Sequence, residues 1–436
     1  MKRTSKPLAR LLTLALTAAL LLCLLTTGAV AARYPDIGGH WGETAIEKWS
    51  DYDILHGTDL GTFDPDGALD TTQLAQLLVN TFGYDQSYTG ALPGYSSIWG
   101  EDAIRKAVAA GVMDASEAAL TLTRELAAKI IAKAFAIAPV TGTSKFVDDY
   151  SITNEYKPYV AALGRAGIFN GNERSEFMPA DSFSRAQIMQ ALDNAVTDVI
   201  KENKTTDSAK SIIINKTNVT LTESVIEDDL IIAQGVGDGD VTLDSVTVKG
   251  RLVVLGGGSN TIRIKGNSNI AEIIVNKTFG QAARVLIDSA DATIGTATIA
   301  AESKAAIAAT STAAAIGSIT VAPATEVNAY GEITTKTTPA ATTLTVTAKA
   351  ATVTIDAPNT ALTLSSGAAI DTLVIEEKTT ATISSGAAVK AATIAASDVK
   401  ISGAGKLTTA LVTADAKSGV EIRTSGTKVT VDKDAG

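Results

Sequence analysis

The stretch GIFNG at residues 167–171, followed by FMP at 177–179 and FSRAQ at 183–187, is the clearest copy of a unit that recurs in this chain. Gly57 lies 114 positions before Gly171. The same offset relates three more pairs of identical residues: Phe63 and Phe177, Pro65 and Pro179, Gln73 and Gln187. A shortened middle copy carries GVM at 111–113, so two intervals of about 57 residues separate three copies. Repetition at this period predicts three structural units that share one core.

Helical periodicity fills the three copies. Apolar residues recur at three-to-four spacing in six segments, which predicts six helices in three pairs. The segments are residues 44–52, 74–82, 101–110, 126–135, 156–166 and 188–196. Asp70, Thr123 and Ser184 each stand just before the second helix of a pair, where a side-chain oxygen would accept from free amides of the first turn. The N-terminal part is therefore predicted to be all-α.

The first thirty-one residues form a segment of a different kind. Lys2, Arg3, Lys6 and Arg10 precede the apolar run 11–25, and Ala-Val-Ala at 29–31 offers small residues for cleavage. This pattern predicts a secretory signal peptide over residues 1–31, because the run is too short for a comfortable membrane span. Cys23, the only cysteine, follows Leu22 where a lipoprotein signal would need a small residue. The mature chain would then have no cysteine for disulfides, thiol chemistry or metal binding.

Charge narrows the partners of the mature chain. The whole chain has 37 basic and 47 acidic residues and a net charge of -10, and loss of the four bases at its start makes it more negative. Such a field repels nucleic acid and anionic lipid. We therefore expect no nucleic-acid partner, no membrane partner after signal cleavage, and a local basic pocket for any acidic ligand. The sequence suggests no cofactor and no metal site.

Composition changes sharply near residue 200. All three tryptophans and both histidines come before it, and Ala, Thr, Val, Ile, Gly and Ser dominate after it. Residues 201–210 are polar and predict a linker, whereas 211–436 alternate in the period-two manner of strands. SSGAAI at 365–370 and SSGAAV at 384–389 match at an offset of 19. Intervals near twenty residues favour a parallel β-solenoid, and a β-sandwich of short strands is the alternative.

The repeated motifs resemble a known family. The order F-x-D, G-I-hydrophobic-x-G, F-x-P and I-T-R-A-E, in three copies after a signal peptide, is similar to the S-layer homology (SLH) domain of bacterial cell-surface proteins. The first copy has YPD at 34–36, Gly57, FDP at 63–65 and LDTTQ at 69–73; the second has GVM at 111–113 and LTREL at 122–126; the third has FVD at 146–148 and the stretches quoted above. The resemblance divides the chain into repeats at 32–86, 87–141 and 142–200.

The resemblance implies a pseudo-threefold helical bundle and a role. Such trimers hold exported proteins on the cell wall by binding a secondary wall polysaccharide, commonly with a pyruvate ketal, in grooves between repeats. The motif arginine is associated with the anionic sugar, and that role falls on Arg124 and Arg185. Thr71 stands at this position in the first copy, and Leu126 replaces the motif glutamate in the second.

The resemblance assigns two further pairs of positions to the polysaccharide site. Asp36 and Asp148 match the motif acids that order a loop, and Gly57 and Gly171 match the glycines that allow close backbone approach. Trp41 and Trp99 recur at one register, which favours a core or groove wall over a sugar-stacking platform.

Two functions remain open at this level. The first is a non-enzymatic surface protein, anchored to the wall and displaying a structural or adhesive β-domain, with self-assembly in an S-layer left open. The second is a wall-anchored polysaccharide lyase or hydrolase with paired carboxylates on the solenoid. Asp228-Asp229 and Asp238/Asp240 are the acids in question, although acids in turns are more often solvated. The GVGDGD run at 235–240 only faintly resembles a calcium loop. We expect no catalysis.

Overall fold

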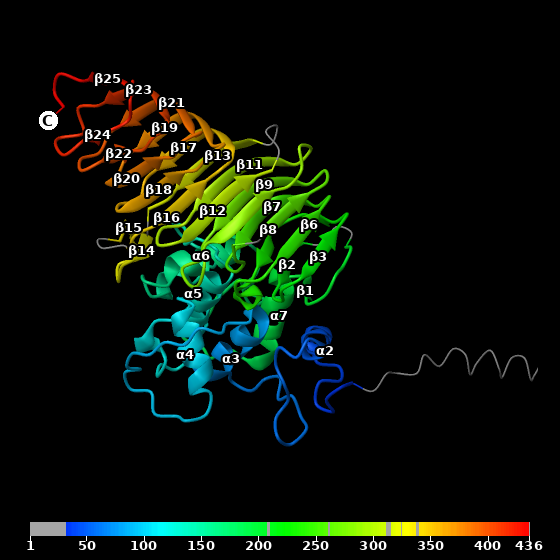
Figure 1. The fold of residues 1–436 in the computed structure, drawn as a ribbon. Coiled ribbons are helices and arrows are strands. Elements are labelled where there is room, and N and C mark those ends of the chain that lie inside the picture. Colours follow the sequence, from blue (N-terminus) through cyan, green and yellow to red (C-terminus); the bar gives the residue numbers. More distant parts are fainter. Residues whose placement is uncertain are drawn as a thin grey trace, which may run out of the picture.

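The protein consists of a helical module followed by a long β-domain (Figure 1). The computed structural model describes residues 32–206, 210–259, 262–310, 315–323, 325–336 and 340–435. The predicted signal peptide lies outside the described residues. Within the part of the chain that is described, no helix is both long and apolar enough to cross a membrane.

Six α-helices make up the described part of the module, as the periodicity predicts. They are α2 (Glu43–Asp51), α3 (Thr71–Phe82), α4 (Glu101–Ala109), α5 (Arg124–Ala134), α6 (Lys157–Arg165) and α7 (Arg185–Ala195). Short 3-10 turns lie at Ala115–Glu117, Asp149–Ser151 and Gln234–Val236. The three predicted N-caps are confirmed: Asp70, Thr123 and Ser184 each accept from the backbone amide three residues on. Each cap satisfies an amide that would lack a partner in the first turn.

The helices close into a ring. The second helix of each repeat packs on the first helix of the next: α3 on α4, α5 on α6, and α7 back on α2. Backbone contacts follow the same rule, because Arg185 N donates to Gly67 O at 3.0 Å and Arg124 N donates to Asp181 O at 2.9 Å. Gly67 and Asp181 are themselves 114 positions apart. This head-to-tail closure gives the module its pseudo-threefold arrangement.

The β-domain is a parallel solenoid, and the β-sandwich alternative is excluded. Among the described residues, every pair of named strands is parallel except the hairpin of β14 (Thr325–Val327) and β15 (Ile333–Thr335). The larger sheet contains β1 (Asp198–Ile200), β2 (Ile212–Ile214), β4 (Val225–Ile226), β5 (Leu230–Ile232), β7 (Thr247–Val254), β9 (Asn269–Val275), β11 (Thr293–Ile299), β13 (Ala315–Val321), β17 (Lys349–Ile355), β19 (Ala369–Ile375), β21 (Ala388–Ile394), β23 (Lys406–Val412) and β25 (Lys428–Val431). A sandwich would require antiparallel pairing of consecutive strands.

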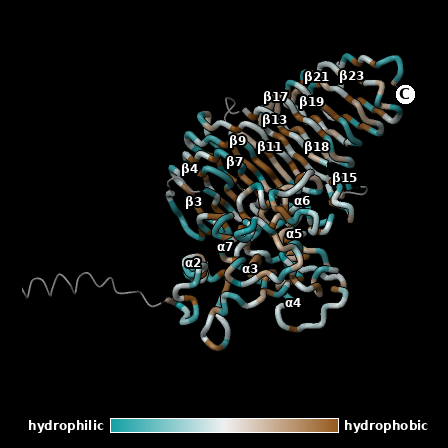
Figure 2. Tube along the Cα trace, turned by 180° about the vertical axis from the view of Figure 1, so that it is seen from behind, coloured by the Kyte–Doolittle hydropathy of each residue, from teal (hydrophilic) through white to brown (hydrophobic). Residues whose placement is uncertain are grey.

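A second sheet lies opposite the first. It contains β3 (Val219–Thr222), β6 (Val241–Asp244), β8 (Ile262–Lys265), β10 (Ala283–Ile287), β12 (Lys304–Ala309), β16 (Thr343–Val346), β18 (Thr360–Leu364), β20 (Thr379–Ile383), β22 (Lys400–Ser402) and β24 (Glu421–Ile422). One coil thus contributes a strand to each sheet, and the predicted offset of 19 appears as the register Ala369↔Ala388. Buried aliphatics such as Ile370 and Val389 stack in columns between the sheets, and hydrophobic segments follow the strands in Figure 2.

The module and the solenoid meet without a gap. Two residues separate the end of α7 from β1, which pairs with β2, and the predicted linker at 201–210 falls between these two strands. Ile213, Ile231 and Val253 point outward from the first coils and are buried in the apolar core of the helical module. Asn215 Nδ2 donates to Thr81 O at 2.9 Å, which ties the two parts further. The start of the solenoid is therefore fixed on the bundle.

Candidate functional site

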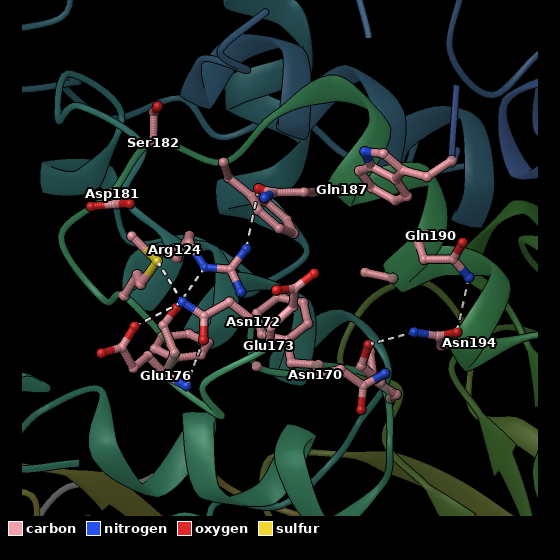
Figure 3. A pocket seen from close by; sticks show the side chains of 18 residues that line it. Arg124, Asn170, Asn172, Glu173, Glu176, Asp181, Ser182, Gln187, Gln190 and Asn194 are labelled. Carbon is pink, nitrogen blue, oxygen red and sulfur yellow. Dashed lines mark hydrogen bonds between the residues drawn. The ribbon is translucent and has the colours of Figure 1, made fainter. Parts of the chain in front are cut away.

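A pocket of about 570 Å³ opens between the second and third repeats (Figure 3). Its floor comes from the Gly171 loop and from α7, and the first repeat contributes Trp41 at its edge. Trp41 is 58% exposed, which is high for so large an apolar side chain. The centre of its ring lies 5.1 Å from the centre of the His40 ring. The pocket thus joins side chains from all three repeats. The sequence predicts a core or groove-wall position for Trp41; its exposure excludes the core, and it lies in the lining of the pocket.

Arg124 is the cation of this pocket. Thr123 caps α5, which sets Arg124 at the first position of the helix and turns its side chain toward the third repeat. The Nε donates to Phe177 O at 2.8 Å and the Nη1 donates to Gln187 Oε1 at 3.1 Å. The guanidinium also lies 5.1 Å from the centre of the Phe177 ring. Among the described residues no acceptor is bonded to its Nη2, and Arg124 as a whole is half-buried.

Arg124 gives the pocket one positive charge, and nearby carboxylates partly offset it. Burial lowers the pKa of Arg124, and the charges of Asp181 and Asp148 oppose this effect. A guanidinium keeps its charge under such conditions because its ordinary pKa is so high. Its planar donors match a carboxylate. The positive potential of the pocket is reduced by three carboxylates in its lining, Glu173, Glu176 and Asp181.

Amide side chains supply most of the other polar groups. Asn170, Asn172, Gln187, Gln190 and Asn194 all line the pocket. Several are held in place: Asn194 Nδ2 donates to Ile168 O at 3.0 Å, and Gln190 Nε2 donates to Asn194 Oδ1 at 3.0 Å. Fixed amides, carboxylates and one guanidinium beside an exposed indole offer both donors and acceptors to a polyhydroxyl ligand.

Sequence analysis did not single out this row of amides. Gln187, Gln190 and Asn194 lie at i, i+3 and i+7, which is one face of a helix. The recurrence of amide side chains on this face of α7 is the signal that would have identified them.

Arg185 occupies the equivalent position at the junction of the third and first repeats, in a different environment. It is only 5% exposed, and it does not line the pocket. Its Nε donates to Phe63 O at 2.7 Å and its Nη2 donates to His56 O at 2.5 Å. Burial lowers the pKa of Arg185, which the charge of Asp64 opposes. The two predicted arginines are therefore not brought together.

The third junction has Thr71 at the position that Arg124 and Arg185 occupy in the other two. Thr71 Oγ1 donates to Leu120 O at 2.7 Å, where the other two junctions place a guanidinium. Trp99, the counterpart of Trp41, is 61% exposed. The three junctions thus share their architecture but differ in chemistry, and one of them combines a half-buried arginine with a measurable pocket.

The predicted acids hold loops from outside the pocket. Asp36 accepts from Phe63 N at 2.8 Å and from Asp64 N at 2.6 Å, and Asp148 accepts in the same way from Phe177 N and Met178 N. Burial opposes ionisation of Asp36, but these backbone donors keep its pKa below the ordinary value. Neither acid lines the pocket.

The predicted glycines are tight points of the same loops. A Cβ on Gly57 would lie 2.5 Å from the Tyr34 ring, and one on Gly171 would lie 2.9 Å from the Ser175 backbone. Gly171 lines the pocket, whereas Gly57 does not. Glycine is therefore required at both positions because neighbouring atoms of the protein itself leave no room for a Cβ.

Comparison with known proteins agrees with this architecture. A model of the S-layer homology domain matches residues 33–70 and 145–189, which lie in the first and third repeats. An amylopullulanase of Thermoanaerobacterium thermosulfurigenes is 24% identical over 165 residues, which cover 35% of this chain and 9% of the relative. The chain therefore corresponds to less than a tenth of that protein.

The fold and site define a repeat-built helical module with a polar groove, fixed to a parallel β-solenoid. More particularly, two segments of the chain match the S-layer homology domain, in the first and third of the three helical repeats, and the solenoid follows them. S-layer homology domains are cell-wall anchoring modules and imply association with the cell surface.

Proposed function

We propose that this protein is held non-covalently on the bacterial cell wall by a secondary wall polysaccharide bound in the Arg124 pocket, and that it displays the solenoid at the surface. The observation that carries the proposal is the pocket itself, whose lining combines Arg124 with a row of fixed amides and the exposed Trp41. The guanidinium would grip a carboxylate of one sugar, such as a pyruvate ketal. The amides would orient the hydroxyls of that sugar.

The charge of the site selects among wall polymers. One guanidinium faces three carboxylates in the pocket, and the chain as a whole carries a net charge of -10. A polyanion with closely spaced phosphates would be repelled by this surface. A polysaccharide with one carboxylate for every few neutral sugars would not, and its hydroxyls could donate to Glu173, Glu176 and Asp181. We therefore propose a sparsely charged ligand.

In this proposal Gly171 contacts the sugar together with Arg124. The other predicted residues act indirectly: Asp148 orders the loop that forms the floor. Arg185, Asp36 and Gly57 have the same role at the neighbouring junction, where they secure the ring on which the pocket depends.

Sedimentation with purified sacculi tests the function. Arg124→Ala is expected to reduce the fraction of protein that sediments, and removal of the polysaccharide from the sacculi should reduce wild-type binding to the same level. Arg423→Ala is the matched control, because Arg423 is an exposed arginine of the solenoid that does not line the pocket. Undiminished binding to stripped sacculi would refute the proposal.

An enzymatic solenoid is the competing function, and the name of the amylopullulanase relative gives it some weight. We propose a structural or adhesive display domain instead, because two of the candidate acids are engaged in ion pairs. Asp229 pairs with Arg251, and Asp238 pairs with Lys277 at 2.6 Å. Release of soluble sugar from wall glycans or starch by the purified protein would favour the enzyme. Surface localisation, and self-assembly in an S-layer, belong to the same proposal.

A further inference from the structure

A second polar crevice lies between the helical module and the solenoid. Its volume is about 490 Å³, and its walls come from α6 and α7 on one side and from the first coils of the solenoid on the other. It shares Ile168 and Asn194 with the Arg124 pocket. Figure 3 places Asn194 at the end of the pocket opposite Asp181 and Ser182. The two hollows therefore adjoin, with Ile168 and Asn194 in the lining of both.

The crevice is preformed. Arg251 from the solenoid donates through Nη1 to Ala136 O in the helical module at 2.9 Å, and its Nε is bonded to Asp229. Ser211 Oγ accepts from Asp229 N at 3.1 Å and continues this wall. Since these contacts fix the solenoid wall against the bundle, a ligand would not have to order it on binding.

Two exposed groups in the crevice remain available to a ligand. Arg165 uses its Nη2 for Thr141 O at 3.2 Å, and no other acceptor among the described residues is bonded to its guanidinium. The carboxylate of Asp228 likewise has no hydrogen-bond or ion-pair partner within the described chain. One donor group and one acceptor group would pair with hydroxyls of a sugar. The whole lining holds three carboxylates and two guanidiniums, which fits neutral sugars better than charged ones.

We infer that the crevice is a second subsite for the same polysaccharide chain. This inference rests on the proposed function. The charged sugar lies at Arg124, the chain passes Asn194, and neutral sugars that follow it contact Arg165 and Asp228. The solenoid thus forms part of the anchor as well as the displayed domain. A chain of several repeating units engages both hollows, and a single repeating unit engages only the first.

The test compares ligand lengths on the full-length mature protein. Wall polysaccharide is released from sacculi of the producing bacterium and fractionated into single repeating units and longer chains, and each fraction is titrated by calorimetry. We expect the longer chains to bind the wild type at least about tenfold more tightly than the single unit, counted per chain. Arg165→Ala/Asp228→Asn should remove most of this advantage and leave single-unit affinity unchanged. Lys390→Ala, an exposed solenoid cation remote from the crevice, is the control.

The outcomes separate the two proposals. Wild-type affinity of the double variant for longer chains would overturn the second subsite, and so would an equal loss for single units and longer chains. If Arg124→Ala instead binds single units as well as the wild type does, the proposed function itself fails. Both crevice residues are exposed, so the double variant is expected to fold, which thermal unfolding checks.

Discussion

Arg185 in the third repeat donates from its Nε to the carbonyl oxygen of Phe63 in the first repeat, across 2.7 Å and 122 positions of sequence. The same side chain lies with its guanidinium carbon 4.6 Å from the centre of the Phe63 ring. This contact joins the last repeat to the first and so closes the helical ring. Arg124 makes the equivalent bond to Phe177 one junction earlier, but its guanidinium remains half-buried beside the pocket.

Replacement of Arg185 tests ring closure. Arg185→Ala leaves the carbonyl oxygens of Phe63 and His56 without their donors, at a cost of about 1–3 kcal/mol for each that stays buried. We expect a clear loss in the free energy of unfolding, measured by urea denaturation followed by circular dichroism. Arg185→Lys should recover only part of it, because an ammonium lacks the planar fork. Unchanged stability of Arg185→Ala would show that packing alone closes the ring.

A buried ammonium holds the second repeat against the third. Lys129 Nζ donates to Asp114 and Glu117 at 2.7 Å and to Glu155 at 3.0 Å. Lys129→Met leaves the buried Glu117 carboxylate without this partner, so we expect destabilisation of about 3–5 kcal/mol at neutral pH. Lys106→Met is the control, because Lys106 pairs with the exposed Asp102. Chemical denaturation of both variants provides the comparison.

The acid dependence of stability follows from Asp114. Burial acts to raise the pKa of Asp114, but Lys133 and Lys129 hold it below the ordinary value. Since the folded pKa lies below the unfolded one, this stabilisation is present above about pH 4 and is lost as pH falls through the folded pKa. Below that range the difference in stability between wild type and Lys129→Met should shrink. A constant difference from pH 7 to pH 3 would contradict this account.

The glycine of the first-repeat loop gives a steric test. A Cβ at Gly57 would lie 2.5 Å from Cε1 of Tyr34 and 2.6 Å from the carbonyl oxygen of Thr62. Gly57→Ala should therefore force the loop and the Tyr34 ring apart and lower stability by about 1–3 kcal/mol. A Cβ at Gly38 would meet nothing within 4 Å, so Gly38→Ala is the matched control. The melting temperatures of the two variants decide the matter.

In the GVGDGD run at 235–240, a lysine ammonium occupies the position beside Asp238 that a metal ion would take in a calcium loop. Lys277 is fully buried, and its Nζ donates to Asp238 Oδ1 and to Gly257 O, both at 2.6 Å. Because this ammonium already neutralises Asp238, we expect added calcium or a chelator to leave the melting temperature unchanged. Lys277→Met should lower it. A calcium-dependent rise in the wild type would show that the loop binds metal.

Local sequence predicted most of the elements, and tertiary contacts decided the site. Asp70, Thr123 and Ser184 predicted the starts of three helices, and the 19-residue offset of the SSGAA motif predicted the length of one coil. The difference in burial between Arg124 and Arg185 could not be predicted, because both residues follow a cap at the start of a helix. Their environments depend on which loop the ring brings opposite: His56 O and Phe63 O enclose Arg185, whereas Gln187 meets Arg124 beside an open pocket. The same holds for Trp41, which lies far from the pocket in sequence.

In the proposed function, the direct passage from α7 into β1 would make the solenoid a spacer of set direction. Only two residues separate the helix from the first strand, and the first coils are packed on the bundle. Each added coil would move its tip outward by about 4.8 Å, the spacing of neighbouring strands, without any change in the anchor. Insertion or deletion of 19-residue coils would thus tune how far the tip stands from the wall, in fixed increments and in a fixed direction.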